Sequence, residues 1–346
     1  MHIIKLHSSK ILRVATFLIS IQNVICFIDP VSMGVGIINL FPSIYNGLVD
    51  NTYCRYSECC NQRGIPANIK ELKTRLSNNL YGQHIVLQHL IPALQAHFSP
   101  ENNSRKPLVL SFHGTPGTGK NFVADQIAEA LYEKGVKSRF VHKYLGRADF
   151  PLEANSHIYK ERINQEVRKA IADCPRTLFI FDEVDKMPEG VFESLTSLVD
   201  YHTLIDKQDS TKAIFIFLSN TAGVLISDRL GNVINSGTLR DDTRIGHFEQ
   251  ILEKAAYNLD GGMKKTSLIE AHVIDHYLPF LPLEKRHIVK CVETEFKKWG
   301  SKPKENVVDS IINDAVTYDR THGLFATSGC KTLDKKVAVE VMHPIY

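Results

Sequence analysis

The chain has 346 residues, 43% of them hydrophobic, and a formal net charge of +3. This length allows one large α/β domain and a smaller one, each with its own core. The small, unclustered net charge argues against nucleic-acid binding, and no internal repeat indicates a solenoid.

The N-terminus has the pattern of a secretory signal. Lys5, Lys10 and Arg13 precede the apolar stretch Val14–Ile28. A basic start followed by about fifteen apolar residues is typical of a signal peptide and is too short for a comfortable membrane span. We therefore predict a signal peptide at residues 1–26 and export of the chain.

A second apolar run, Val31–Phe41, follows the signal. About eleven residues are too few to cross a bilayer, but they are enough to lie in one leaflet, and an ordinary buried helix is the alternative. With a cysteine cluster at its end, residues 27–60 form a segment distinct from the domain that follows.

Cysteine usage agrees with export. Once Cys26 is removed with the signal, the chain keeps Cys54, Cys59, Cys60, Cys174, Cys291 and Cys330. An even number in an oxidising compartment allows up to three disulfides, with the pairing left open. The first three cysteines lack a convincing fourth ligand for zinc. Asn102 begins an Asn-Asn-Ser glycosylation sequon in a polar loop, which predicts a glycan there.

A phosphate-binding loop is the strongest motif of the chain. The apolar run Leu108–His113 predicts a buried strand, and Val123–Leu131 has helical periodicity. Between them lie the predicted nucleotide contacts Gly114, Thr115, Pro116, Gly117, Thr118, Gly119, Lys120 and Asn121. Strand, glycine loop and helix in this order make the match credible, because loop amides and the helix N-terminus bind phosphate. Lys120 is expected to reach the β- and γ-phosphates.

Asn121 departs from the usual pattern, in which a Ser or Thr hydroxyl binds magnesium at this position. An amide oxygen is also a hard ligand, but it is longer and takes a different position. We therefore expect an altered magnesium site formed by Asn121 and Asp182.

Two adjacent carboxylates end the next apolar strand. The run Leu178–Phe181 leads directly into Asp182 and Glu183, and buried strands do not end in acids without a cation or proton nearby. Asp182 is expected to hold magnesium through water, and Glu183 to activate the attacking water as general base. Asp185 is expected to cap the following helix.

A third strand at 212–218 is followed by Asn220, whose amide is placed to orient the water and sense the γ-phosphate. Taken alone, an asparagine here is more often a turn residue, but the two nucleotide motifs favour the functional interpretation.

The order of elements predicts a doubly wound parallel α/β sheet at residues 61–283. Its strands are expected near 107–113, 136–143, 177–182, 212–218 and 273–281, and its helices near 119–134, 156–172, 187–201 and 243–258. A small helical domain at 284–346 follows, with helices at 283–299, 304–318 and 331–341. ATP is expected in the groove between the two domains.

From about Tyr53 to its end the chain resembles the torsins, Clp-related AAA+ ATPases of the endoplasmic reticulum lumen and nuclear envelope. The motifs that carry the resemblance are Tyr53-Cys54 with Glu58-Cys59-Cys60-Asn61, the loop ending in Lys120-Asn121, Phe179–Met187, Phe215–Asn220, Pro279–Leu283 and Gly329-Cys330-Lys331. Asn121 is itself a torsin trait. The resemblance implies an AAA+ P-loop fold with ATP and Mg²⁺ as cofactors.

The resemblance also assigns roles that the residues alone do not. It makes Lys331 a second sensor that reaches the nucleotide from the helical domain, beside the catalytic Glu183 and Asn220. It makes Cys291 and Cys330 a disulfide pair through which nucleotide binding responds to redox state.

Torsins lack the arginine that AAA+ neighbours insert at the γ-phosphate, which is worth about 10³–10⁵ in rate in related phosphoryl transfer. The resemblance therefore implies weak hydrolysis alone and a membrane-anchored activator with an AAA+-like lumenal domain that supplies an arginine in trans. It allows a homo-oligomer and peripheral membrane association, and it places the chain in the lumen of the endoplasmic reticulum and nuclear envelope. We expect Arg229, Arg240 and Arg244 to be solvated.

Three functions remain open at this point: an activator-dependent ATPase that remodels proteins or membranes, a ring-forming Clp-type unfoldase, and a nucleotide-regulated scaffold without catalysis. Tyr144-Leu145-Gly146 is the one suggestive pore-loop sequence, and it lies close to a strand end. The intact acid pair argues against a pure scaffold, which needs no water-activating carboxylate.

Overall fold

The computed structural model describes Cys54 and residues 57–200, 204–205, 208–258, 261–266, 269 and 272–342. The predicted signal peptide and the apolar run 31–41 lie outside the described residues. The chain divides into two compact units, Met1–Cys59 and Cys60–Tyr346. Within the first unit, Cys54 and Cys59 form a disulfide. All features below belong to the second unit.

A five-stranded sheet with strand order β2-β3-β6-β1-β7 forms the centre of this unit, and every pairing in it is parallel. Its strands are β1 (Leu108–His113), β2 (Val141–Leu145), β3 (Leu178–Asp182), β6 (Ile214–Ser219) and β7 (His276–Pro279). From β1 the chain crosses to the edge strand β2, returns through β3 and β6 to the neighbour of β1, and adds β7 on the other side of β1. The predicted parallel α/β sheet is therefore confirmed.

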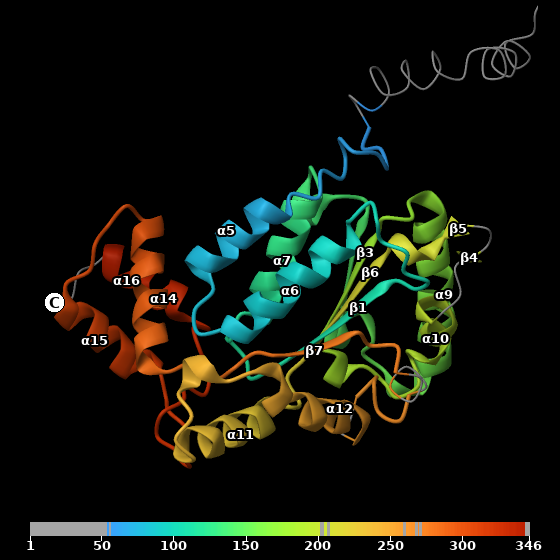
Figure 1. Cartoon of the computed structure of the whole chain (residues 1–346). Coiled ribbons are helices and arrows are strands. Elements are labelled where there is room, and N and C mark those ends of the chain that lie inside the picture. Colours follow the sequence, from blue (N-terminus) through green and yellow to red (C-terminus); the bar gives the residue numbers. More distant parts are fainter. Residues whose placement is uncertain are drawn as a thin grey trace, which may run out of the picture. The chain divides into compact units, whose positions relative to one another are not determined.

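Helices cover both faces of the sheet (Figure 1). One face packs against α5 (Ile69–Asn79), α6 (His84–His97) and α7 (Lys120–Leu131), and the other against α9 (Ser156–Asp173), α10 (Glu193–Val199), α11 (Gly223–Asn235) and α12 (Glu249–Asn258). Successive strand residues point alternately into the cores on the two faces of the sheet. The core beneath α5, α6 and α7 receives mostly leucine and isoleucine from the strands. The core on the other face contains the stacked pairs Phe179–Phe215 and Phe181–Phe217, with ring centroids 4.7 and 5.2 Å apart. This alternation is what a sheet buried on both sides requires.

Several element boundaries differ from the sequence prediction. The second strand begins at Val141 and not near 136, because Gly135–Lys137 forms a 3₁₀ turn. The helix expected at 187–201 is reduced to α10, since Pro188 and the left-handed Gly190 precede it. The helices α5 and α11 were not predicted, whereas α6 contains His84 and His89, which lie in a stretch predicted to be helical. Two short strands, β4 (Leu204–Ile205) and β5 (Gln208–Asp209), form a separate antiparallel pair.

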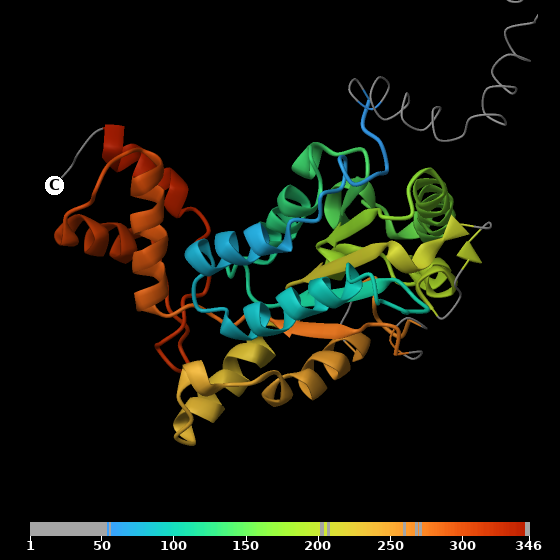
Figure 2. The same cartoon turned by 45° about the horizontal axis from the view of Figure 1, so that its top comes forward.

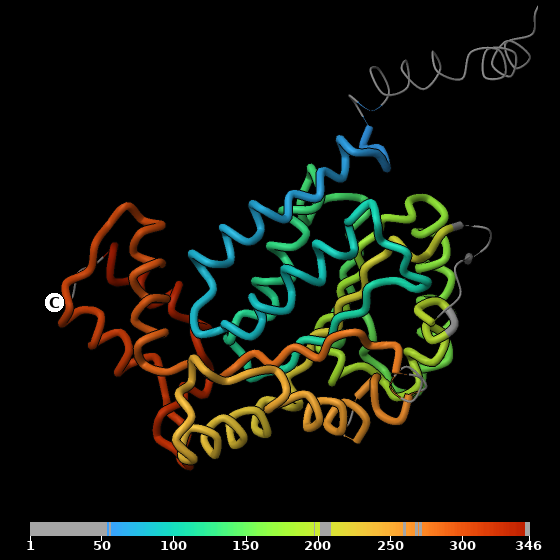
Figure 3. The backbone as a smooth tube through the Cα atoms, viewed as in Figure 1, coloured from blue at the N-terminus to red at the C-terminus, as the bar shows by residue number. Residues whose placement is uncertain are grey.

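The last helices form a small domain with its own apolar core, here called the lid. It consists of α14 (Lys285–Lys298), α15 (Glu305–Ala315) and α16 (Leu333–Met342). The backbone enters it directly from β7, as Figure 2 and the tube in Figure 3 show. Leu283, at the junction, pairs with Ala326 in an isolated antiparallel bridge. The lid is the helical domain expected after the sheet.

Two further disulfides are present in this unit. Cys60 is bonded to Cys174, 114 residues further along the chain, and Cys291 of α14 is bonded to Cys330. Across the described part of the chain, no helix has the length and apolar character needed to cross a bilayer.

Candidate nucleotide site

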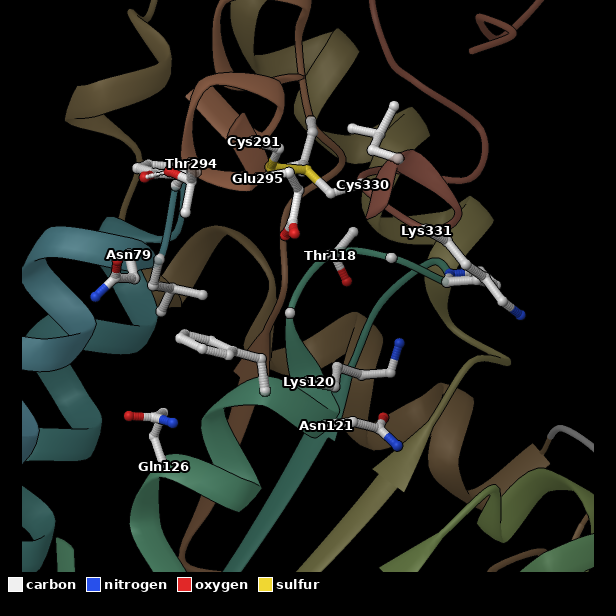
Figure 4. A pocket seen from close by; sticks show the side chains of 18 of the residues that line it. Asn79, Thr118, Lys120, Asn121, Gln126, Cys291, Thr294, Glu295, Cys330 and Lys331 are labelled. Carbon is white, nitrogen blue, oxygen red and sulfur yellow. Dashed lines mark hydrogen bonds between the residues drawn. A yellow bond between two sulfur atoms is a disulfide. The ribbon is translucent and has the colours of Figure 1, made fainter. Parts of the chain in front are cut away.

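A pocket of about 770 Å³ opens where the carboxyl end of the sheet faces the lid (Figure 4). Its lining includes predicted site residues from both parts: Pro116, Gly117, Thr118, Gly119, Lys120, Asn121, Asp182, Glu183, Asn220, Cys291, Cys330 and Lys331. Gly114 and Thr115 lie beneath this lining, where their carbonyls bind Lys120. The predicted glycosylation site Asn102 lies elsewhere, exposed in the loop between α6 and β1.

The phosphate loop leads from β1 into α7. Gly117 and Gly119 have φ angles of +75° and +106°, which glycine adopts without strain. Lys120 is buried, and its Nζ donates to the carbonyls of Gly114 and Thr115 at 2.7 and 3.0 Å. Burial lowers the pKa of Lys120 to about 8, although Asp182 and Asp185 act in the opposite direction. The buried hydroxyl of Thr115 has no hydrogen-bond partner in the part of the chain described. A lysine that binds only its own loop, beside an unpaired donor, fits a site for phosphate.

The acid pair lies at the end of β3. Asp182 is 8% exposed, and its Oδ1 accepts the backbone N–H of Glu183 at 2.8 Å. Glu183 has a left-handed φ of +54°, an uncommon conformation for a non-glycine residue and one that clusters at functional sites. Its carboxylate is half-buried and lies 3.5 Å from Nε of the exposed Arg147. A Cβ on Gly146 would lie 2.3 Å from the Glu183 carbonyl, so Gly146 permits this turn to approach α8 (Gly146–Asp149).

At the predicted magnesium site, the side chains of Asn121 and Asp182 contact each other directly: Nδ2 of Asn121 donates to Oδ2 of Asp182. Each Asp182 oxygen thus accepts a hydrogen bond, and the side-chain oxygen of Asn121 is left as a hard ligand. The described residues contain no cluster of three or more His, Cys, Asp or Glu side chains able to cage a metal. The donor set fits Mg²⁺, which keeps several waters and takes one or two protein ligands plus phosphate oxygens.

Asp185 connects the acid pair to Asn220 and does not cap a helix, contrary to our expectation. Its side chain is 2% exposed, and its Oδ1 accepts the backbone N–H of Asn220 at 3.1 Å. The expectation failed because Asp185 lies inside the 3₁₀ turn Val184–Lys186, where its carboxylate faces the neighbouring strand end and not a helix terminus. Asn220 follows β6 and lines the pocket.

His113 lies directly before the phosphate loop and is almost completely buried. Burial lowers its pKa to about 3, and the nearby Lys120 charge acts in the same direction. Its Nε2 lies 2.7 Å from the Ser111 hydroxyl. His113 is therefore neutral and acts as a packing residue under the loop.

The lid contacts the phosphate loop through Gly329 and Cys330. The Cys330 N–H donates to the Gly117 carbonyl at 3.0 Å. A Cβ on Gly117 would lie 1.9 Å from the Ser328 carbonyl oxygen, and one on Gly329 would lie 2.4 Å from that of Gly117. Only glycine at both positions permits this contact. Lys331 is exposed at the same edge, and Glu295 of α14 points toward the loop from the other side (Figure 4).

The segment between α5 and α6 contributes residues that sequence reasoning missed. Gln83 is 1% exposed, and its amide binds the Thr118 carbonyl at 3.1 Å and both backbone groups of Leu281 at 2.8 Å. Tyr81 contacts Thr294 of the lid, hydroxyl to hydroxyl, at 2.5 Å. The one available signal was the position of Gln83, a polar residue directly before the helix that begins at His84.

Arg240 is buried and not solvated, which corrects our expectation; Arg229 and Arg244 are exposed as expected. Nη1 of Arg240 lies 3.2 Å from Glu284, and Nη2 of Arg240 donates to the Gly82 carbonyl at 2.9 Å. Arg240 therefore ties the segment between α5 and α6 to the start of the lid. Tyr144 is also buried, stacked on Phe181 at 4.9 Å, and is not available as a pore-loop aromatic.

Comparisons with known proteins agree with this geometry. A family model described as Torsin matches residues 54–181, and one described as Torsin-1A, C-terminal domain, matches residues 283–339. The chain is 58% identical over 319 residues to a Torsin-like protein of Drosophila melanogaster, covering 91% of this chain and 93% of that protein. It is 35% identical to a Torsin-like protein of Caenorhabditis elegans (85% and 83% covered) and 32% identical to Torsin-3A of Homo sapiens (85% and 75% covered).

Among solved structures, the Hsp104–ADP complex of S. cerevisiae superimposes with a TM-score of 0.53 at 16% identity. The match covers 80% of this chain and 48% of the Hsp104 chain, so this protein spans about half the length of Hsp104. At this identity the likeness shows the fold alone.

Proposed function

The chain belongs to the torsin family of AAA+ proteins, and from this premise we propose that it hydrolyses ATP in the pocket between its sheet and its lid. The single observation that supports hydrolysis is the pocket itself, which brings Lys120, Glu183 and Asn220 together. A nucleotide switch without catalysis has no use for Glu183.

In the proposed reaction each residue has one task. The loop amides and Lys120 hold the phosphates, Asn121 and Asp182 hold Mg²⁺, and Lys331 reaches the nucleotide from the lid. When bound, Mg²⁺ neutralises phosphate charge. Glu183 removes a proton from the attacking water, and Asn220 positions this water. Asn220 is held in turn by Asp185, whose carboxylate accepts its backbone N–H.

We further propose that hydrolysis is weak until a membrane-anchored partner adds an arginine. Within the described residues, Arg147 is the one arginine that lines the pocket. It is 71% exposed, and its Nε lies 3.5 Å from Glu183, so it pairs with the proposed base. Arg240 is committed to the lid junction. This distribution supports an arginine supplied in trans.

We also place the protein in the lumen of the endoplasmic reticulum and nuclear envelope. Three disulfides in the described residues support an oxidising compartment, as does the sequon at Asn102. The buried Tyr144 makes an aromatic pore loop, and with it a Clp-type unfoldase, the weaker candidate.

The Glu183→Gln variant tests this proposal. It keeps the size and hydrogen-bonding reach of the side chain but cannot accept the proton, so we expect normal ATP affinity, hydrolysis reduced by about 100-fold or more, and stable capture of the activating partner. Hydrolysis is measured with and without lumenal domains of candidate membrane partners.

Glu161→Gln, an exposed change on α9, serves as the matched control and is expected to keep full activity. Equal hydrolysis by Glu183→Gln and the control would remove Glu183 from the role of base. Vigorous hydrolysis by the natural chain without any partner would contradict activation in trans.

A further inference from the structure

The end of α14 and the loop that follows carry an unusual set of side chains. Residues 297–304 read Lys-Lys-Trp-Gly-Ser-Lys-Pro-Lys, which places four lysines around the single tryptophan of the chain. No acidic residue occurs between Glu295 and Glu305. Trp299 is 46% exposed, and all four lysines are exposed. We call residues 297–304 the lid loop.

Most of the lid-loop charge is free to meet a partner. Lys298 is paired with Glu295 at 2.6 Å. For Lys297, Lys302 and Lys304, no ion pair is found with any residue that the structure describes. The lid loop therefore presents three cations beside an exposed indole ring.

A hollow of about 870 Å³ lies between α14 and α15 beneath this loop, but it does not have one sign of charge. Its lining mixes the carboxylates of Glu293, Glu305 and Asp309 with the ammonium groups of Lys285, Lys297 and Lys302. Asp309 is already paired with Lys285 at 2.9 Å. An anion in the hollow would face these carboxylates. Because the hollow has mixed charge and the lid-loop lysines are all exposed to solvent, negative charge is attracted to these exposed lysines and not into the hollow.

We propose that the lid loop is a docking surface for an anionic phospholipid bilayer. Tryptophan is enriched at membrane–water interfaces, where its ring lies at headgroup depth, and lysines extend from the same level to phosphate groups. Each lysine near an anionic surface contributes about 1 kcal/mol. An acidic protein surface is less favoured because lysine is depleted in protein–protein interfaces, where arginine is enriched.

The position of the loop suits this contact. In both Figure 1 and Figure 2, the connection between α14 and α15 lies at the end of the lid that is turned away from the sheet. Gly300 has a left-handed φ of +68°, which turns the chain directly after Trp299. Membrane contact here goes beyond the proposed ATPase function and does not depend on it.

Because Trp299 is the only tryptophan, its fluorescence tests the proposal in the intact exported protein. Phosphatidylserine-rich vesicles are expected to shift its emission to the blue and protect it from iodide, whereas phosphatidylcholine vesicles are not. Lys302→Gln combined with Lys304→Gln is expected to weaken vesicle affinity by about 30-fold, at about 1 kcal/mol per lysine. Lys335→Gln with Lys336→Gln, on α16, is the matched control and is expected to have little effect.

Three results would overturn the proposal. Vesicles that sediment the protein without changing Trp299 emission would place membrane contact in another segment. Equal shifts with both kinds of vesicle would remove the role of anionic lipid, and a shift with polyglutamate but not with vesicles would identify an acidic protein as the partner. ATP affinity, measured on the same variants, is expected to be unchanged, which separates this test from that of the ATPase function.

Discussion

At the scale of single residues, Lys120 is a buried cation with a lowered pKa. Its buried ammonium binds two carbonyls of its own loop, and burial lowers its pKa to about 8. Phosphates placed beside it would raise that pKa, since an opposite charge favours the protonated form. ATP binding is therefore expected to be coupled to protonation of Lys120.

The sign of this coupling predicts how affinity changes with pH. Below a pH of about 8, Lys120 of the free protein is already protonated, so ATP affinity has its full value. Above a pH of about 8, Lys120 must take up a proton when ATP binds, so ATP affinity falls by up to about tenfold per pH unit. Calorimetry between about pH 7.5 and 9.5, in buffers of different ionisation enthalpy, measures the ATP affinity and the number of protons taken up. Adenosine, which lacks phosphates, is expected to show no such dependence. Constant ATP affinity across the range would contradict this role of Lys120.

The acid pair shows what residue-level reasoning from sequence can and cannot reach. The loop Gly114–Asn121 and the Asp182-Glu183 pair were identified because each follows a buried strand with a local, contiguous motif. The link between Asp185 and Asn220 was missed, because it joins residues from two strands whose neighbouring positions in the sheet are not encoded locally.

At the scale of elements, Arg240 and Glu284 form a junction between the two parts of the nucleotide-binding unit. Their pair is 3.2 Å apart with Arg240 only 3% exposed in its side chain, and Gly82 completes the contact. The sequence indicated a solvated arginine because its partners come from segments about 44 and 158 residues away. No periodicity in the residues near Arg240 reports such partners.

Removal of this arginine is expected to destabilise the protein. Arg240→Ala leaves the Gly82 carbonyl without its partner and removes the buried charge that faces Glu284, which keeps only the exposed Arg286. A carbonyl and a partly buried carboxylate that lose these hydrogen bonds cost about 1–3 kcal/mol of unfolding free energy. Arg244→Ala, exposed in the same segment, should change it by less than about 0.5 kcal/mol. Chemical denaturation compares the two variants. An Arg240→Ala protein with full stability but no hydrolysis would instead identify Arg240 as a catalytic arginine.

At the scale of the whole nucleotide-binding unit, the strand and helix order predicted the sheet and the lid, but not the contact between them. The motif containing Gly329 and Cys330 was recognised by resemblance alone, since in sequence it is a loop tripeptide more than 200 residues from the phosphate loop. In the structure, backbone meets backbone there, with Cys330 bound to Gly117. The disulfide from Cys330 to Cys291 fixes the same loop to α14.

Close backbone approach makes Gly329 the position where the lid's effect on the nucleotide can be tested. A Cβ at Gly329 would lie 2.4 Å from the Gly117 oxygen, so Gly329→Ala must push the lid away from the phosphate loop. Gly323→Ala is a matched control in the lid, because Gly323 also has a positive φ, +66° against +52°, but has open space around its Cβ position. In both variants, the left-handed backbone conformation at the new alanine lowers stability by about 1–2 kcal/mol. Only Gly329→Ala is expected to lose ATP affinity, by about tenfold or more. Fluorescent-nucleotide titration measures the affinity, and thermal unfolding verifies that both variants fold. If the two variants bind ATP equally well, the contact between Cys330 and Gly117 is not part of how the lid holds the nucleotide.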